Sequence, residues 1–314
     1  MEIEIGSTLS QICTYGRNIL SKKGLEYNIA ALETDVIIKE FTGYDRLYIM
    51  LNQDEKLEEH AVSKIREALL QRQNNKPMAY VLGHREFGLY DFYCEEGVLI
   101  PRPDTEILVD AVESKLKNKS LDSKRPFYAI EIGAGSGIIS ITLLSRFENL
   151  NMIAGDINPI ALELARRNAI YVDSQNVENN IKSKVNTRLS LVYSNIFENI
   201  EPLKLYDNSN EDYFYEFIVS NPPYIRSDEI QSLMEDVKDF EPVSALDGFE
   251  DGLYFYKKII EDGYRLIKYG GFMAFEIGYD QAEDVKAIFE KNKYKNIEII
   301  KDLAGHDRVV LGFK

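Results

Sequence analysis

Apolar residues recur at helical spacing along the first 75 residues of the chain. The helical segments that this pattern predicts cover residues 9–24, 28–41 and 54–69. In the first segment Leu9, Ile12 and Ile19 share one face, and Gly24 is suited to end the helix. None of the three segments carries a catalytic motif. We therefore interpret residues 1–76 as a small helical bundle that forms a separate N-terminal domain.

Residues 77–104 have a different pattern, and we interpret them as a linker built around a β-hairpin. Residues 87–93 and 97–100 are expected to be its two strands, closed around Cys94, Glu95 and Glu96. Proline lacks an N–H group, so the prolines at positions 101 and 103 are expected to end the second strand.

From residue 105 to residue 314, short apolar runs alternate with amphipathic segments. The predicted strands of this region are residues 128–132, 152–157, 189–194, 214–220 and 271–277. The predicted helices are residues 136–147, 159–172, 252–267 and 281–291. Such alternation is typical of a parallel sheet with helices on both faces. Residues 195–213 are polar and interrupted, and we expect a surface loop there.

The last two predicted strands, residues 297–301 and 308–312, are separated by only a short turn. Strands joined in this way pair antiparallel, so they are expected to form a mixed edge on the parallel sheet. The predicted fold class is therefore α/β. It consists of a mostly parallel, seven-stranded Rossmann-like sheet with an antiparallel final hairpin, preceded by the small helical bundle.

Composition and the N-terminal sequence indicate the cellular compartment of the chain and whether it binds a metal. No apolar run approaches the roughly 20 residues that a membrane-spanning helix needs, and the N-terminal Met-Glu-Ile-Glu-Ile-Gly lacks the pattern of a secretory signal. Cys13 and Cys94 do not make a disulfide framework, and the three histidines have no ligand spacing. We expect a cytoplasmic protein without a metal site, and a monomer.

Charge bears on the partners that the chain can have. The net charge is −15, and residues 1–86 are nearly balanced, with 11 basic and 13 acidic residues. The remainder holds 26 basic and 39 acidic residues and is strongly acidic. Broad binding to a phosphate backbone needs a basic face, so we do not expect a nucleic-acid partner.

The first predicted strand of the sheet runs into a glycine-rich turn. The sequence there is Glu131-Ile132-Gly133-Ala134-Gly135-Ser136-Gly137. Alternating glycines let the backbone turn tightly and approach a ligand, and ligands of open α/β sheets bind at the carboxyl ends of the strands. The spacing G-x-G-x-G differs from that of a pyrophosphate cradle and favours a nucleoside with a smaller, charged tail.

Two further strand ends extend this nucleoside hypothesis. The second strand ends at Asp156 and Ile157, and a carboxylate there can accept hydrogen bonds from both ribose hydroxyls. Its alternative role is to cap the helix that begins after Asn158. The third strand ends before Asn195 and Ile196, which are candidates to contact an adenine ring, although Asn195 equally suits an ordinary turn.

The fourth strand ends in Asn221-Pro222-Pro223-Tyr224. Two consecutive prolines fix two φ angles and make the turn rigid. The Asn221 side-chain oxygen and the Pro222 carbonyl are acceptors, and Tyr224 adds an aromatic face. This set suits a flat, conjugated NH2 group, whose lone pair the two acceptors would orient toward an electrophile. The tetrapeptide alone is equally compatible with a simple strand terminator.

Together these motifs carry a family resemblance. The sheet resembles that of class I S-adenosylmethionine-dependent methyltransferases, and Asn-Pro-Pro-Tyr is similar to the motif of their amino-methylating branch. The stretches 76–87, 99–106 (Leu-Ile-Pro-Arg-Pro-Asp-Thr-Glu) and 302–310 resemble those of peptide chain release factor glutamine methyltransferases, the HemK/PrmC family. The resemblance covers nearly the whole chain. The chain has Glu131 where many members have Asp, and Asn195 where an acid is common.

The resemblance implies a reaction and a set of site residues. The methyl group of S-adenosylmethionine would go to the side-chain nitrogen of glutamine in the Gly-Gly-Gln motif of class 1 release factors, leaving S-adenosylhomocysteine. Residues 1–76 would then be a substrate-recognition domain and residues 105–314 the methyltransferase domain. The implied cofactor residues are Glu131, Gly133, Ala134, Gly135, Ser136, Gly137, Asp156, Ile157, Asn195, Ile196 and Asn221. The implied substrate residues are Asn221, Pro222, Pro223, Tyr224, Arg102 and Thr105, with Asn221, Pro222 and Tyr224 in catalytic roles.

Three alternatives remain open on the sequence. An adenine-N6 DNA methyltransferase shares the tetrapeptide, but it would carry a basic face and a target-recognition domain. A ribosomal-protein glutamine methyltransferase also shares it but usually differs around residues 101–106. A non-catalytic S-adenosylmethionine binder would be expected to have a damaged tetrapeptide, whereas this one is intact.

Overall fold

The computed structural model of the chain describes residues 3–118, 125–179, 181–202 and 214–314. The chain divides into two units. One comprises Met1–His84 with Met234–Phe240, and the other comprises Arg85–Leu233 with Glu241–Lys314. The predicted surface loop at residues 195–213 lies largely outside the described residues. None of the helices in the described ranges combines the length and apolarity needed to cross a bilayer.

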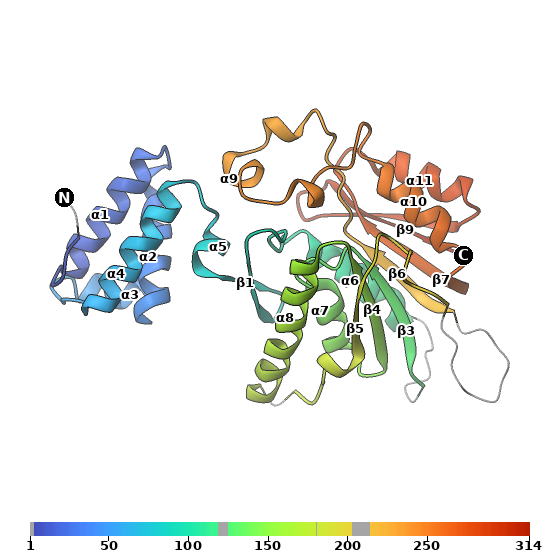
Figure 1. Ribbon diagram of the computed structural model, residues 1–314, viewed down its shortest axis with the longest axis horizontal. Helices are drawn as coiled ribbons and strands as arrows, with labels where there is room; N and C mark the ends of the chain where they lie inside the picture. The colour runs from blue at the N-terminus through green and yellow to red at the C-terminus, as the bar shows by residue number, and fades with distance from the viewer. Residues whose placement is uncertain (1–2, 119–124, 180, 203–213) are drawn as a thin grey trace. The chain divides into compact units, whose positions relative to one another are not determined.

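The first unit is the predicted helical bundle (Figure 1). Its helices are α1 (Leu9–Lys22), α2 (Tyr27–Thr42), α3 (Arg46–Leu51), α4 (Glu59–Gln73) and α5 (Met78–Leu82). Thr8 starts α1 with a capping box shared with Gln11, and Gly43 ends α2 in the left-handed conformation. The apolar faces meet in one core that contains Leu9, Ile12 and Leu69. The short α9 (Glu235–Lys238) belongs to this unit, where Asn75 Nδ2 donates to Glu235 Oε2 over 2.7 Å.

The predicted position of the hairpin was wrong. The two strands are β1 (His84–Phe87) and β2 (Tyr90–Tyr93), joined at Gly88, whose φ of +59° suits a two-residue hairpin turn. Residues 97–100 form no strand. Instead of pairing with 97–100, β2 packs on α8 (Pro159–Glu178), where the Tyr93 N–H donates to Asn168 Oδ1 over 2.8 Å.

The second unit contains a seven-stranded sheet in the order β5-β4-β3-β6-β7-β9-β8. Its strands are β3 (Phe127–Ile132), β4 (Leu150–Asp156), β5 (Leu189–Tyr193), β6 (Tyr215–Ser220), β7 (Ile267–Glu276), β8 (Lys295–Lys301) and β9 (Asp307–Phe313). The first five are parallel, whereas β9 runs antiparallel to both β7 and β8. The mostly parallel sheet with an antiparallel final hairpin is confirmed.

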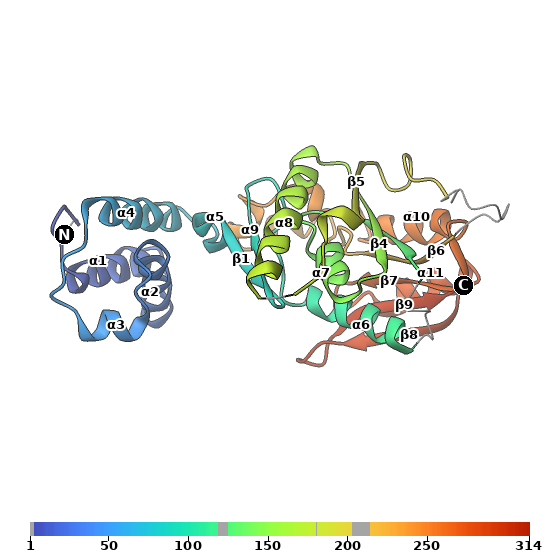
Figure 2. The same ribbon diagram turned by 90° about the horizontal axis from the view of Figure 1, so that it is seen from below.

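Helices cover both faces of this sheet (Figure 2). On one face lie α6 (Thr105–Asn118), α7 (Ile138–Arg146) and α8, and on the other lie α10 (Tyr254–Gly263) and α11 (Ala282–Lys291). Successive side chains of a strand point to opposite faces, so Phe217 of β6 packs under α6 and α7 while Ile218 packs under α10. Every residue of β6 is buried, as expected for a central parallel strand.

Two helix bounds differ clearly from the prediction. The helix expected at 159–172 continues to Glu178, and the one expected at 252–267 ends at Gly263 because β7 already begins at Ile267. Gly270 and Gly271 interrupt the apolar pattern of β7, and the pairing of β6 with β7 shifts register between Tyr215 and Phe217. Because of this irregularity, the sequence pattern did not predict residues 267–270 as part of the strand.

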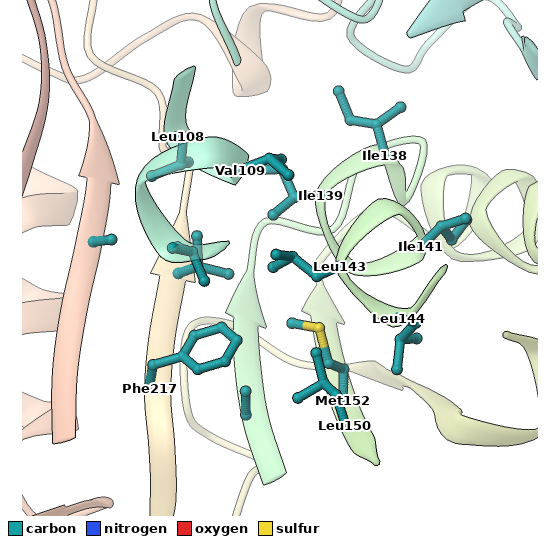
Figure 3. Close-up of a cluster of buried hydrophobic side chains, with 14 of the residues drawn as sticks. Leu108, Val109, Ile138, Ile139, Ile141, Leu143, Leu144, Leu150, Met152 and Phe217 are labelled. Carbon is teal, nitrogen blue, oxygen red and sulfur yellow. The ribbon is translucent and has the colours of Figure 1, made fainter. Parts of the chain in front are cut away.

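We expect Phe217→Ala to lower the free energy of unfolding by about 3–5 kcal/mol, because it removes a fully buried ring. The ring stacks on Phe272 at 5.4 Å between centroids, in the cluster with Leu108 and Leu143 shown in Figure 3. Chemical denaturation measures the change. Leu303→Ala is the control, because this side chain is fully exposed and its loss should change stability by less than about 0.5 kcal/mol. Equal effects of the two substitutions would contradict this packing.

Candidate active site

The carboxyl ends of three adjacent strands bring the predicted site residues together. Ile132 of β3 pairs with Gly155 of β4 on one side and with Ser220 of β6 on the other. The next residue on each strand therefore reaches the same edge of the sheet. These residues are Gly133, Asp156 and Asn221.

A cavity of about 350 Å³ opens at this edge, with a smaller one of about 40 Å³ beside it. The predicted site residues that line the larger cavity are Gly133, Gly135, Asp156, Ile157, Ile196, Asn221, Pro222 and Pro223. Those that line the smaller one are Arg102, Thr105, Glu131, Gly133, Ala134, Gly135, Ser136 and Asn221. Since both share Gly133, Gly135 and Asn221, they form two parts of one site. Residues 97–99, expected in a strand, line the larger cavity instead.

The glycine turn needs its glycines for both conformation and space. Gly133, Gly135 and Gly137 have φ values of +75°, +52° and +82°, in the left-handed region that residues with a Cβ rarely adopt. Gly137 lines neither cavity, but a Cβ there would lie 3.0 Å from the Cβ of Ala165. Gly137 therefore allows α7 to approach α8, while Gly133 and Gly135 leave backbone exposed to the cavity.

Asp156 ties the glycine turn to the end of β4. Its Oδ2 accepts from the Gly135 N–H over 2.8 Å, and its Oδ1 accepts from the Asn158 N–H over 2.8 Å. Desolvation raises the pKa of the Asp156 carboxyl, and these backbone hydrogen bonds oppose that shift. The Ile157 backbone acts in the same direction. A carboxylate has about four acceptor sites, so these contacts leave acceptor capacity for a ligand. The Asn158 side chain, not Asp156, caps α8 through the Ile160 N–H.

Glu131 lines the smaller cavity and has one side-chain oxygen without a partner. Its side chain is fully buried, and its Oε2 accepts from both the backbone N–H and the hydroxyl of Ser140. The other oxygen, Oε1, is buried without a hydrogen-bond partner. Desolvation raises the pKa of Glu131 to about 8, although Ser140 counteracts it. A buried acceptor without a partner is costly, and a bound cationic group would satisfy it.

Residues 248–252 and the Gln281 side chain fix the backbone of the Asn-Pro-Pro-Tyr turn. Gln281 Nε2 donates to the Tyr224 carbonyl over 3.0 Å and to the Gly252 carbonyl over 3.3 Å. Gly248 and Gly252 pack directly against the turn, and a Cβ on Gly252 would lie 2.4 Å from the Tyr224 oxygen. The turn is therefore rigid because its neighbours fix it as well as because of its prolines.

The side chains of this turn face a buried polar cluster. Asn221 Nδ2 donates to Thr105 Oγ1 over 3.3 Å. Tyr224 lines neither cavity, and desolvation together with nearby Glu276 raises its pKa to about 12, so its hydroxyl stays protonated at neutral pH. Arg102 forms an ion pair with the buried Glu241 at the rim of the smaller cavity.

Asn195, like Gly137, is a predicted cofactor residue that lines neither cavity. Its side chain is exposed, donates to Glu198 Oε1 over 3.1 Å and lines neither cavity. Its neighbour Ile196 does line the larger cavity, with φ at +53°. The expected contact of Asn195 with adenine stays a prediction.

Several residues that shape the site were not identified from the sequence, namely Glu241, Gly248, Gly252, Glu276 and Gln281. For Glu276 a signal existed, because it is a carboxylate at the carboxyl end of a predicted strand, as Asp156 is. The others act through contacts with distant segments and carry no local signal. Among the residues that the structure describes, no group of three or more His, Cys, Asp or Glu side chains is placed to hold a metal ion.

Comparison with known proteins adds family information to this geometry. Residues 11–83 match the family model described as the PrmC N-terminal domain, and residues 104–237 match the methyltransferase small domain. The chain is 37% identical to the release factor glutamine methyltransferase of Clostridium botulinum, over 96% of this chain and 98% of that protein. It is 36% identical to the enzyme of that name from Fusobacterium nucleatum, over 90% and 73% of the two chains. For Clostridium acetobutylicum the identity is 34%, over 90% of both.

We expect Gly252→Ala to destabilise the protein more than Gly270→Ala does. Both glycines have φ near +70°, so each substitution costs about 1–2 kcal/mol in backbone strain. Only at Gly252 would the new Cβ collide with the Asn-Pro-Pro-Tyr turn, which adds about 1–3 kcal/mol. Thermal or chemical unfolding of the two variants measures the difference. An equal loss of stability in the two variants would mean that the Asn-Pro-Pro-Tyr turn shifts to accommodate the new Cβ at position 252 without a measurable cost.

Proposed function

Because the chain belongs to the family of release factor glutamine methyltransferases, we propose that it methylates the glutamine of the Gly-Gly-Gln motif in class 1 release factors. The chain is an S-adenosylmethionine-dependent enzyme with a methyltransferase domain. The observation that carries the assignment of the nucleophile is the rigid Asn221-Pro222-Pro223-Tyr224 turn at the rim of the larger cavity. We assign the accepting atom to the glutamine side-chain nitrogen.

The residues at the sheet edge fit this cofactor. The unpaired Oε1 of Glu131 is suited to its ammonium group, and the exposed backbone of the glycine turn to the rest of its methionine part. The remaining acceptor capacity of the Asp156 carboxylate is suited to the ribose hydroxyls. Ile157 and Ile196 add apolar surface for the nucleoside. We retain Asn195 as a proposed adenine contact. To reach the ring, its side chain would have to break the hydrogen bond to Glu198 Oε1.

Bound at this site, the cofactor supplies a methyl group on a positively charged sulfur. Asn221 Oδ1 and the Pro222 carbonyl accept the two N–H bonds of the substrate amide. An amide nitrogen is a weak nucleophile because its lone pair is delocalised, and this double contact orients the lone pair toward the methyl group. The same acceptors stabilise the positive charge that develops on nitrogen as the N–C bond forms and the C–S bond breaks. The methylated amide then loses a proton to solvent, so a strong base is unnecessary.

The remaining predicted residues are proposed to shape the entrance of the site. Arg102 is fixed by Glu241 at the rim of the smaller cavity, where it can meet an incoming protein backbone or carboxylate. Tyr224 is proposed to pack beside the glutamine side chain. We further propose that residues 1–76 recognise the release factor, that residues 77–104 act as a linker and that residues 105–314 perform the transfer. The match of residues 11–83 to a family model supports a distinct role for the first part.

The other candidate substrates are not favoured. The curated relatives are named for release factors rather than for DNA or a ribosomal protein. The strongly acidic composition after residue 86 also opposes a DNA substrate.

The purified chain should transfer labelled methyl groups from S-adenosylmethionine to a class 1 release factor. No label should reach a release factor variant in which the glutamine of Gly-Gly-Gln is alanine, because the accepting nitrogen is missing. Scintillation counting with mass spectrometry of the tryptic peptide checks the amount and position of the label. Duplex DNA serves as the competing substrate. Label on DNA alone, or equal label on the alanine variant, would contradict the proposed function.

Substitutions at Asp156 and Asn221 should separate cofactor binding from methyl transfer. We expect Asp156→Ala to weaken S-adenosylmethionine binding about 10-fold or more, because charge-assisted hydrogen bonds are lost. Asn221→Ala should lower kcat about 100-fold, by loss of one oriented acceptor, while changing cofactor affinity by less than about 3-fold. Calorimetric Kd values and steady-state kinetics provide the two readouts. A proportionate loss of both in Asn221→Ala would mean that Asn221 mainly holds cofactor.

A further inference from the structure

Asn221 alone does not determine which end of its amide meets the substrate. The two ends of an Asn side chain have nearly the same shape, but the oxygen accepts hydrogen bonds and the NH2 group donates them. Only the oxygen can receive an N–H of the glutamine amide. Catalysis by Asn221 therefore requires a neighbouring group that occupies its NH2 end.

A buried carboxyl group lies beside this amide. Ser220 of β6 pairs with Phe275 of β7, so the residues that follow, Asn221 and Glu276, reach the sheet edge side by side. The Glu276 side chain is buried at this edge, and the neighbouring Thr105 and Asn221 side chains both act to lower its pKa. Thr105, the first residue of α6, is also buried and accepts from Asn221 Nδ2 over 3.3 Å.

We propose that Glu276 is a positioning residue whose carboxylate sets the direction of the hydrogen bonds through Thr105 to Asn221, so that Asn221 presents its oxygen to the substrate. This inference rests on the proposed function and adds a residue to its machinery. An ionised carboxylate only accepts hydrogen bonds, so the Thr105 hydroxyl donates to Glu276. The Thr105 oxygen then has lone pairs left to accept from Asn221 Nδ2, and Asn221 Oδ1 remains free.

A purely structural role fits Glu276 poorly. Arg308 is the nearby cation, but its ion pairs are with Asp104 and Asp302. One Glu276 oxygen, Oε2, is buried without a hydrogen-bond partner. Burying a carboxyl in this way is costly, and an apolar or amide side chain of similar size would fill the space at lower cost. The acceptor-only character of a carboxylate gives Glu276 a role that neither replacement could fill.

The ionisation of Glu276 makes the arrangement sensitive to pH. Desolvation raises the pKa of Glu276 to about 7, with Asp104 acting in the same direction and Thr105, Arg308 and Asn221 opposing it. The groups that face the carboxyl come from β9 (Arg308), from the segment before α6 (Asp104), from the turn after β6 (Tyr224) and from α10 (Tyr256). Below this pKa a protonated Glu276 can itself donate, and the direction of the hydrogen bonds is lost. The kcat should therefore fall as pH decreases through about 7.

Glu276→Gln, Thr105→Val and Thr105→Ser test the inference on the full chain with release factor as substrate. Gln can donate as well as accept, so Glu276→Gln should lower kcat about 100-fold and remove the decline near pH 7. Thr105→Val should lower kcat about 10-fold, and Thr105→Ser, which keeps the hydroxyl, should restore it to near the wild-type value. The Kd for S-adenosylmethionine should change by less than about 3-fold in all three.

Glu216→Gln is the matched control. Glu216 is buried in the neighbouring strand β6, near its start, where it forms an ion pair with Lys268. This substitution should leave kcat and its pH profile unchanged. Circular dichroism reports whether each variant folds. If Glu276→Gln does not fold, the difference in kcat between Thr105→Val and Thr105→Ser tests the inference instead.

Wild-type kcat in folded Glu276→Gln, or equal kcat in Thr105→Val and Thr105→Ser, would overturn this inference while leaving the proposed function intact. A wild-type protein that does not methylate release factor would overturn the proposed function and this inference with it.

Discussion

The site depends on the parallel, in-register pairing of β3 with β4 and β6. Parallel strands end at the same edge of a sheet, so the residues that follow them, Gly133, Asp156 and Asn221, meet without any direct contact in sequence. The pairing of β6 with β7 adds Glu276 to the same edge. The buried helices on both faces fix this arrangement, because a shift of one residue in any of these strands would turn its apolar side chains away from their cluster. The apolar core and the polar site are therefore two consequences of one pairing.

The two halves of the site obey different physical requirements. On the cofactor side, glycines remove side chains so that a ligand can approach the backbone, and Glu131 keeps one buried oxygen without a partner. On the substrate side, prolines and the Gln281 side chain fix the backbone of the Asn-Pro-Pro-Tyr turn. On the cofactor side this leaves the Glu131 oxygen unsatisfied in the folded protein. A ligand that supplies the missing hydrogen bonds recovers free energy that the empty site lacks, and this favours binding in the required orientation.

The sequence allowed most of the sheet to be predicted because its central strands are continuous apolar runs that end at Gly, Asp or Asn-Pro. The positions of Gly133, Asp156 and Asn221 followed directly from those ends. The hairpin was misplaced because residues 97–100 are apolar for other reasons. Val98 packs on Ala161 and Leu164 of α8, and residues 97–99 line the larger cavity. Thr105 was placed near the entrance, but its bond to Asn221 joins residues 116 positions apart, and no local pattern encodes such a contact. The role of Glu276 depends on the same long-range packing.

The proposed methyl transfer requires that two acceptors, Asn221 Oδ1 and the Pro222 carbonyl, hold one flat amide. A crystal structure of the chain with S-adenosylhomocysteine and a Gly-Gly-Gln peptide tests it most directly. We expect the glutamine side-chain nitrogen to lie about 3 Å from both oxygens, with its remaining face toward the sulfur. We also expect Asn221 Nδ2 to stay bonded to Thr105. A glutamine nitrogen bound elsewhere, or an Asn221 that presents its NH2 group to the substrate, would contradict it.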